Sequence, residues 1–331
     1  MSNKFLSTTS AFLLSTSMLV ADAPKVTVDI APVHSLVSKI MNGVGKPDLI
    51  IPAGASPHEY QLKPSNAKAL EDADLVFWIG EDLTPWLEKG LSSLAQDSSI
   101  TALLGVDGIE LLSFREGALF EAHDHDDHDD HDDHGKKKHD DHDDHDDHGK
   151  KKHDDHDDHA HGDHDPHAWL SPQIAKVWLN VIAAKLSEAD PDNAGKYFSN
   201  AKLARDNMDS LVSKVNSILD PIREKKFVVF HDAYQYFEKD FGISASGAIS
   251  MGDASDPSPA RLAEIRKRVV DEAVECVLAE PQYNQGLVKA VVEGTNANTA
   301  VIDPLGVKLE SGPDLYENLI RNLATNLAKC F

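Results

Sequence analysis

Residues 226–237 read KFVVFHDAYQYF, and this segment indicates the fold class. It opens with a short apolar run, KFVVF, which is typical of a buried strand. Helical patterns flank that run and five others along the chain: VTVDI at 26–30, DLII at 48–51, DLVFWIG at 74–80, CVLAE at 276–280 and TAVID at 299–303. Because short buried strands that alternate with helices are typical of parallel sheets, we predict an α/β protein with mostly parallel sheets.

Helical stretches divide the six strands into two sets of three. Ser171-Pro172 opens one helix, to about Ala189, and a second helix of about 28 residues follows at 192–219. At 1.5 Å per residue the second helix spans about 40 Å. We expect it to be a rigid connector between two (β/α) lobes, and a merely peripheral helix is the alternative. Further helices are predicted at 35–42, 64–72, 83–95, 313–329 and from Ser258-Pro259 to about Cys276.

The N-terminus predicts export. Residues 1–23 contain Lys4, an apolar stretch to Val20 and the ending Ala21-Asp22-Ala23, which is the pattern of a secretory signal peptide cleaved near Ala23. A membrane anchor is the alternative, but the stretch is short and rich in Ser and Thr, whereas a span needs about 20 apolar residues. We therefore expect a periplasmic mature protein. Its predicted parts are a first lobe at 24–190, a connecting helix at 191–219 and a second lobe at 220–331.

The charge of the chain is concentrated in one segment. A net charge of −24 over 331 residues argues against nucleic acid or an anionic membrane as a partner, because both require basic patches. Residues 121–165 hold 19 Asp, one Glu and six Lys, together with 14 of the 18 His. The unit HDDHDDHDDHGKKK occupies 125–138, recurs at 139–152 and begins again at 153. Because the unit has no apolar residue to bury, we expect this insert to be disordered.

The insert is also predicted to bind metal ions. Neutral imidazole is a good ligand for Zn²⁺, Cu²⁺ and Ni²⁺, and neighbouring carboxylates add charge attraction. We expect weak, multiple and poorly selective sites, because a disordered segment imposes no fixed geometry. The alternative is a solvated acidic linker. The accessory tract comprises His123, His125, His128, His131, His134, His139, His142, His145, His148, His153, His156, His159, His161 and His164.

Outside the tract, three chemically useful side chains follow predicted strands. His58 follows DLII, His231 follows KFVVF, and Asp303 ends TAVID. Open α/β sheets place ligand sites at these carboxyl ends, and three His with one carboxylate suit a four-coordinate Zn²⁺ if His167 joins them. A hydrogen-bonded loop histidine, or an aspartate that shapes a turn before proline, is the alternative for each residue alone. His34 is also at the end of a strand, and we favour it as a bystander over an alternative ligand.

Five motifs give these residues a family resemblance: GASPHEYQLKPS, HDPHAWLSP, VVFHDAYQYF, AEPQYN and VIDPLG. They resemble, in order, the motifs of the ZnuA-like zinc-binding proteins of bacterial ABC importers. The resemblance covers the mature chain and implies two lobes joined by a long helix, with zinc at their interface. It implies the ligands His58, His167 and His231. Asp303 matches an interfacial carboxylate, but the fourth ligand stays open between Asp303, Glu59 and water.

The resemblance also bears on the identity of the metal ion and on the pairing of the two cysteines. Manganese and iron relatives tend to carry Glu where this chain has His231, so a third imidazole indicates Zn²⁺. Two cysteines in an exported protein favour a disulfide between Cys276 and Cys330 over two buried thiols, and the resemblance implies the same pair.

The predicted function is therefore capture and not catalysis. We expect a monomer that binds zinc in the periplasm and delivers it to an inner-membrane ABC permease. The chain has no P-loop, so the cytoplasmic ATPase must be a separate subunit. The alternatives are an exported zinc buffer or storage protein, and a zinc hydrolase, which the absence of HExxH disfavours. The tract could gather, sense or buffer zinc.

Overall fold

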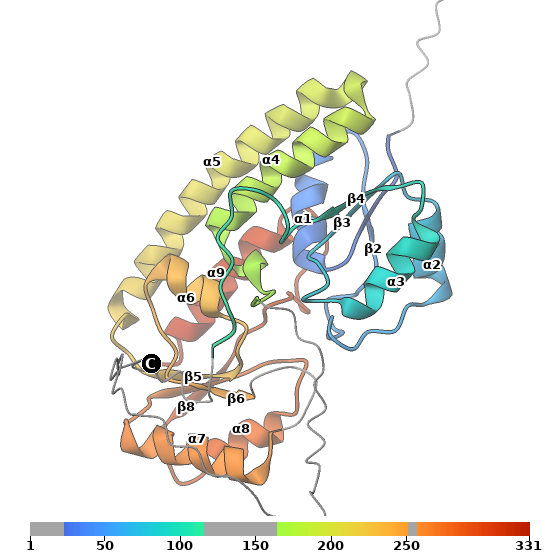
Figure 1. The fold of residues 1–331 in the computed structure, drawn as a ribbon. Coiled ribbons are helices and arrows are strands. Elements are labelled where there is room, and N and C mark those ends of the chain that lie inside the picture. The colour runs from blue at the N-terminus through green and yellow to red at the C-terminus, as the bar shows by residue number, and fades with distance from the viewer. Residues whose placement is uncertain (1–22, 116–163, 251–256) are drawn as a thin grey trace, which may run out of the picture.

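The computed structural model describes residues 23–115, 164–250 and 257–331, which form two four-stranded parallel sheets (Figure 1). The strand orders are β2-β1-β3-β4 and β6-β5-β7-β8, so both sheets repeat one topology. This confirms the predicted α/β class with two lobes. The strands are β1 (Val26–Val28), β2 (Asp48–Leu49), β3 (Leu75–Trp78), β4 (Ser99–Ala102), β5 (Phe227–His231), β6 (Ala248–Ser250), β7 (Cys276–Ala279) and β8 (Asn298–Val301).

Two strands, β4 and β6, were not predicted. Both are edge strands, and β4 lacks the apolar run of a buried strand because its side chains are exposed or half-buried. The helix predicted to end near Cys276 ends instead at Asp271, because Ala273 has a left-handed backbone (φ 52°) that turns the chain into β7. The helices are α1 (Ala31–Ile40), α2 (Pro64–Glu71), α3 (Pro85–Leu94), α4 (Pro172–Ala189), α5 (Ala194–Leu219), α6 (Gln235–Phe241), α7 (Pro259–Asp271), α8 (Gln285–Val292) and α9 (Leu315–Ala328).

Helices cover both faces of each sheet. In the first lobe α1 and α4 lie on one face and α2 and α3 on the other, and in the second lobe α7 and α8 lie opposite α6 and α9 (Figure 1). The two helix starts predicted from Ser-Pro pairs are confirmed: the Ser171 hydroxyl accepts a hydrogen bond from the Ile174 N–H, and the Ser258 hydroxyl accepts one from the Arg261 N–H. The helix predicted at 35–42 begins earlier, at Ala31. These caps satisfy backbone donors that have no partner within the helix.

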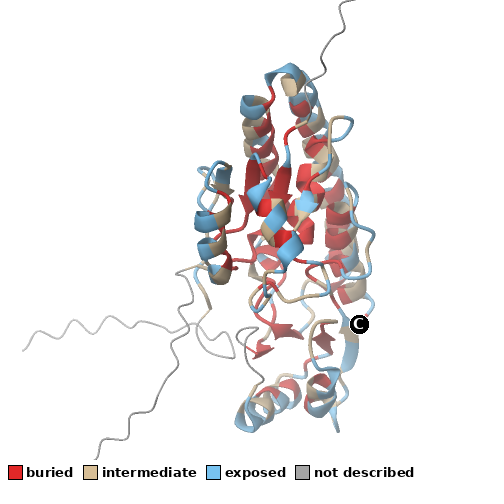
Figure 2. Cartoon of the chain, turned by 90° about the vertical axis from the view of Figure 1, so that its right-hand side faces the viewer, coloured by how far each residue is buried: buried red, intermediate tan, exposed pale blue. Residues whose placement is uncertain are grey.

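The long helix α5 is packed along its length and is not an isolated rod. It lies against α4, and α9 returns from the second lobe to pack against both α5 and α1. One hydrophobic cluster therefore runs through both lobes, while a second, separate cluster lies between the second sheet and helices α7 and α8. In Figure 2 the central strands and the inner helix faces are buried, and the exposed residues lie on the outside and on edge strands. Because the two lobes share one core, α5 and α9 fix their relative orientation.

A disulfide joins Cys276 and Cys330, as predicted, with a Cα–Cα distance of 5.7 Å. Cys276 is the first residue of β7, and Cys330 follows α9, so the bond ties the end of the chain to a central strand. Both residues are buried. The bond therefore anchors α9, the helix through which the second lobe packs on the first.

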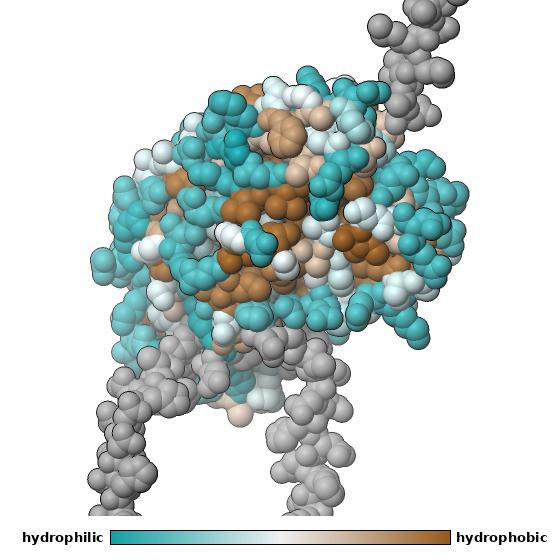
Figure 3. Space-filling view, turned by 45° about the horizontal axis from the view of Figure 1, so that its top comes forward, coloured by the Kyte–Doolittle hydropathy of each residue, from teal (hydrophilic) through white to brown (hydrophobic). Residues whose placement is uncertain are grey.

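Two predicted segments fall largely outside the description. The leader at 1–23 and the insert at 121–165 are in this group, and His164 is the one tract histidine among the described residues. Its backbone forms an antiparallel bridge with Ser113. Within the described ranges, no helix has the length and apolar character needed to cross a membrane. The face shown in Figure 3 has hydrophilic side chains around its margin and hydrophobic ones near its centre.

Candidate metal site

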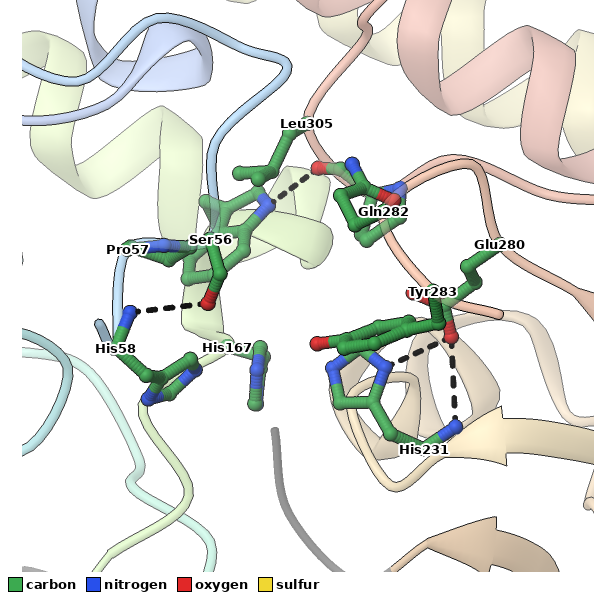
Figure 4. A pocket seen from close by; sticks show the side chains of 11 residues that line it. Ser56, Pro57, His58, His167, His231, Glu280, Gln282, Tyr283 and Leu305 are labelled. Atoms are coloured by element: carbon green, nitrogen blue, oxygen red, sulfur yellow. Dashed lines mark hydrogen bonds and ion pairs between the residues drawn. The ribbon is translucent and has the colours of Figure 1, made fainter. Parts of the chain in front are cut away.

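A small pocket lies where segments of both lobes meet, and three histidines line it (Figure 4). Its cavity of about 10 Å³ is close to the volume that one water-sized sphere needs. The structure therefore brings His58, His167 and His231 together, as the sequence predicts. The lining residues are Ser56, Pro57, His58, His167, Trp169, His231, Glu280, Gln282, Tyr283, Pro304 and Leu305.

His58 lies on the loop between β2 and α2, and a tryptophan from α3 holds that loop. Trp86 Nε1 donates a hydrogen bond of 2.8 Å to the carbonyl of Pro57, the residue before His58. The His58 N–H donates to the Ser56 hydroxyl, and the Tyr60 ring lies against Trp86. His58 is half-buried, which makes it the most accessible of the three histidines. The position of its imidazole depends on this loop.

His167 immediately precedes a short 3₁₀ turn at Ala168–Leu170, and a buried carboxylate holds its ring. Asp165 Oδ1 accepts hydrogen bonds from the His167 backbone N–H at 2.9 Å and from His167 Nδ1 at 2.7 Å. Because a carboxylate only accepts hydrogen bonds, Nδ1 carries the proton and Nε2 has a lone pair to offer to a metal ion. Asp165 thus selects the tautomer that ligation requires.

His231 is the last residue of β5, and Glu280 holds it in the same way. His231 Nδ1 donates to Glu280 Oε1 at 2.7 Å, and both residues are buried. Glu280 directly follows β7, the strand next to β5. The pair therefore lies where strand order reverses between neighbouring parallel strands, which is where open α/β sheets bind ligands. Nε2 of His231 is again the nitrogen left for a metal ion.

The spacing of the rings resembles that of a zinc site. Zn–N bonds of 2.0–2.1 Å in tetrahedral geometry place imidazole centroids about 5 Å apart. The centroid of His167 lies 5.7 Å from that of His58 and 5.3 Å from that of His231, and His167 lies between the other two (Figure 4). Among the described residues no three His, Cys, Asp or Glu side chains are yet placed to hold one ion. Binding one ion by all three histidines therefore requires their rings to move closer together.

The two carboxylates considered as a fourth ligand lie elsewhere. The Asp303 oxygens accept hydrogen bonds from the backbone N–H groups of Leu305, Gly306 and Val307 and from the Gln282 amide. Asp303 lines a separate cavity of about 180 Å³ and is not among the residues that line the histidine pocket. Glu59 is exposed and does not line the pocket.

His34 is outside the pocket too, as expected of a bystander. Its Nε2 lies 3.1 Å from the carbonyl oxygen of Pro47, and burial lowers its pKa.

Aromatic side chains surround the ring of His231. The rings of Tyr234 and Tyr283 lie 6.1 and 5.4 Å from its ring, and Tyr283 stacks on Phe230. Burial raises the pKa of Tyr234, and the charges of Glu280 and Asp303 raise it further. The Tyr234 phenol therefore stays protonated and neutral. The negative charge nearest the imidazoles comes from Asp165 and Glu280, which complement a divalent cation.

Two parallel-sheet lobes that share one core, with a ligand pocket between them, define a two-lobed α/β solute-binding protein. The chain belongs to the ZnuA family, because the sequence model of that family, "Zinc-uptake complex component A periplasmic", matches residues 26–330. A relative from Brucella abortus, named high-affinity zinc uptake system protein ZnuA, is 48% identical over 314 residues, which cover 95% of this chain and 93% of the relative.

Solved structures support the fold independently. A ZnuA deletion mutant with zinc bound matches with a TM-score of 0.71 at 22% identity, over 93% of this chain and 98% of that one. The SBP FpvC from Pseudomonas aeruginosa in complex with Mn²⁺ matches with a TM-score of 0.70 at 17% identity, over 93% and 97% of the two chains. The same fold thus carries different metals, so the metal must be argued from the side chains.

Sequence reasoning missed three residues that hold the histidines: Asp165, Glu280 and Trp86. Glu280 ends the predicted strand CVLAE, so the rule that identified His231 would also have found it. Asp165 lies two residues before His167, but that spacing alone does not reveal a hydrogen bond. Trp86 carried no signal, because its bond to Pro57 joins segments that only the tertiary structure brings together.

Proposed function

We propose that this protein captures Zn²⁺ in the pocket between its lobes and delivers it to an inner-membrane ABC permease driven by a separate ATPase. The observation that carries the proposal is the pair of carboxylate–imidazole hydrogen bonds, Asp165–His167 and Glu280–His231, both 2.7 Å long. Such bonds orient ligating histidines and raise their basicity. Zinc-uptake relatives that match nearly the whole chain support the same function. The mature protein would act in the periplasm after cleavage near Ala23.

The proposed ligands are Nε2 of His58, His167 and His231, with water in the fourth position. Water fits because Asp303 and Glu59, the carboxylates considered for this position, lie outside the pocket. Three imidazoles favour Zn²⁺ over the harder Mn²⁺, which prefers oxygen ligands. Zinc is therefore the proposed cargo, although a neighbour of the same fold holds manganese.

Capture fits the pocket better than hydrolysis does. A hydrolase needs a carboxylate or imidazole that can take a proton from metal-bound water. Asp165 and Glu280, the buried carboxylates at the site, are hydrogen-bonded to the histidines that they orient. The enclosed volume of about 10 Å³ between the histidines is the size of a single small ion or water molecule. An exported zinc buffer remains the second candidate, because the chain carries fourteen tract histidines in addition to the pocket.

The test is a competition titration with a zinc chelator, on the mature protein and on the same protein without residues 123–161. We expect the protein without the tract to retain one tight zinc site. This site should be lost in His231→Ala and should persist in His34→Ala. Manganese should compete poorly for this site. If the tight site disappears with the tract, the pocket is not the capture site and the buffer function takes its place. Zinc uptake is then measured in cells with and without the inner-membrane ABC permease. Uptake that depends on both the protein and the permease indicates an importer, and uptake that does not depend on the permease indicates a buffer.

A further inference from the structure

The chain segments on either side of residues 116–163 are both bonded to helix α6 of the second lobe. Arg115 precedes this stretch, and Asp165 follows it closely. Helix α6 begins four residues after His231, so the contacts form beside two of the three pocket histidines. The residues that border the insert are therefore part of the surroundings of the metal site.

Arg115 forms the centre of a buried ion network. Its Nε donates to both oxygens of Asp232 at 3.0 Å, its Nη1 donates to Glu238 Oε2 at 2.8 Å, and its Nη2 bonds both carboxylates. The side chains of Asp232 and Glu238 are 4% and 6% exposed, and that of Arg115 is 16% exposed. Asp232 directly follows His231, so the network is adjacent in sequence to a pocket histidine.

A second set of bonds connects the same segment to His167. The carbonyl of Leu112 accepts the Asp165 N–H at 2.8 Å, and the Tyr236 hydroxyl donates to the Asp165 carbonyl at 2.9 Å. Gln235 Nε2 donates to Asp165 Oδ2 at 3.2 Å and to the Ser113 carbonyl at 3.0 Å. Asp165 Oδ1 in turn accepts hydrogen bonds from the backbone N–H and from Nδ1 of His167. Residues 112–115 thus link the second lobe to the carboxylate that orients His167.

The desolvation free energy of these buried charges indicates that the network has a role besides stability. Removing three charges from water is unfavourable, and replacing buried ion pairs by apolar residues is often neutral or stabilising. Among the described residues, one guanidinium faces two buried carboxylates in this network. Stability alone therefore does not account for it. A role in fixing geometry accounts for the network, because a guanidinium binds carboxylates through several directional hydrogen bonds.

We propose that Arg115 is a positioning residue for the metal site, which sets the spacing of His167 and His231. It anchors residues 112–115 to Asp232 and Glu238, and those residues hold Asp165 and through it His167. The inference rests on the proposed function, since it concerns the affinity of the same pocket for zinc.

The first experiment measures zinc release from the full mature protein. The protein is loaded with one equivalent of Zn²⁺ and mixed with excess EDTA, and the slow phase is assigned to the pocket. Arg115→Met should accelerate that phase severalfold. The expected effect is smaller than the roughly 10–100-fold contribution of a direct partner of a ligand, because Arg115 acts on the histidines through other residues. Arg205→Met is the control, since Arg205 on α5 bonds Asn180 on α4 and does not contact the Arg115 network. Its release rate should match that of the parent.

A second variant separates positioning from simple stability. Arg115→Met leaves two buried carboxylates without their cation and lowers the melting temperature of the zinc-free protein. Arg115→Met/Asp232→Asn/Glu238→Gln removes all three charges and should restore the melting temperature while release stays fast. Recovery of slow release together with stability would overturn the inference, as would an unchanged rate in Arg115→Met. A parent protein without a slow phase would instead refute the proposed function itself.

Discussion

Glu280 Oε1 lies 2.7 Å from Nδ1 of His231, and this bond joins the carboxyl ends of the two central strands of the second sheet. The first sheet has the same strand order, and Asp29 lies at the corresponding place after β1. Asp29 is buried and accepts hydrogen bonds from the N–H groups of Ile30 and Ile79, each at 2.7 Å. The carboxyl end of the corresponding strand therefore carries a pocket histidine, His231, in the second lobe. In the first lobe it carries Asp29, whose carboxyl group is bound by backbone N–H groups.

Glu280→Gln should weaken zinc binding by about tenfold or more. Glutamine can still accept the hydrogen bond from His231 Nδ1, but it lacks the charge that raises the basicity of the imidazole and offsets the cation. Competition titration with a chelator measures the change. Glu275→Gln is the matched control, because Glu275 is exposed and pairs with Lys225 at the other end of β7. Equal affinities in the parent and in Glu280→Gln would show that the carboxylate does not tune the site.

Trp86→Phe should reduce zinc affinity severalfold, because it removes the N–H that holds Pro57 beside His58. The lost hydrogen bond is also expected to lower the free energy of unfolding by about 1 kcal/mol. Trp178→Phe provides the control, since Trp178 Nε1 donates an equivalent bond of 2.9 Å to Leu103 far from the pocket. Both variants are compared by urea unfolding and by zinc titration. A similar loss of affinity in the two would contradict a specific role of Trp86.

Asp29 should make the zinc-free protein less stable as the pH rises from about 4 to 7. Burial raises the pKa of Asp29 from 3.8 to about 7, and its backbone hydrogen bonds oppose only part of this shift. In this window the folded state binds more protons than the unfolded state, so the free energy of unfolding falls by at most about 1.4 kcal/mol per pH unit.

Asp29→Asn provides the measurement for this effect. The amide cannot accept both backbone bonds, so the variant is less stable at low pH, but it lacks the titrating proton. Urea unfolding of parent and variant at several pH values cancels the contribution of other groups. Their difference in free energy should shrink as the pH rises, and a constant difference would refute the prediction.

Reduction of the Cys276–Cys330 disulfide should lower the free energy of unfolding by about 4 kcal/mol on the loop-entropy model, given the separation of 54 residues. Zinc affinity should change little, because Cys276 and Glu280 lie at opposite ends of β7, roughly 13 Å apart at 3.3 Å per residue. Unfolding with and without a phosphine reductant measures the first effect, and chelator competition measures the second. Cys276→Ala/Cys330→Ala should reproduce both results. A large loss of zinc affinity on reduction would show that the disulfide also shapes the pocket.

The order of strands and helices was predictable because it depends on local patterns. An apolar run such as KFVVF, and a Ser-Pro pair such as Ser171-Pro172, carry their structural preference within a few residues. The edge strand β4 escaped prediction, since an exposed edge needs no apolar run. The histidines were predictable for a related reason: parallel strands bring their carboxyl ends to one edge wherever they lie in the chain.

The sequence by itself therefore determined the α/β class, the strand-end histidines and the pair of cysteines. Only the tertiary structure decided which carboxylates accept hydrogen bonds from the pocket histidines. Asp303 and His231 both lie at the carboxyl ends of strands, yet the oxygens of Asp303 accept hydrogen bonds from the turn amides of residues 305–307. Glu280, by contrast, reaches across from the neighbouring strand to His231. A hydrogen bond depends on tenths of an ångström and on side-chain rotamers. Such distances between segments 49 residues apart arise only when the sheet has formed and its core is packed.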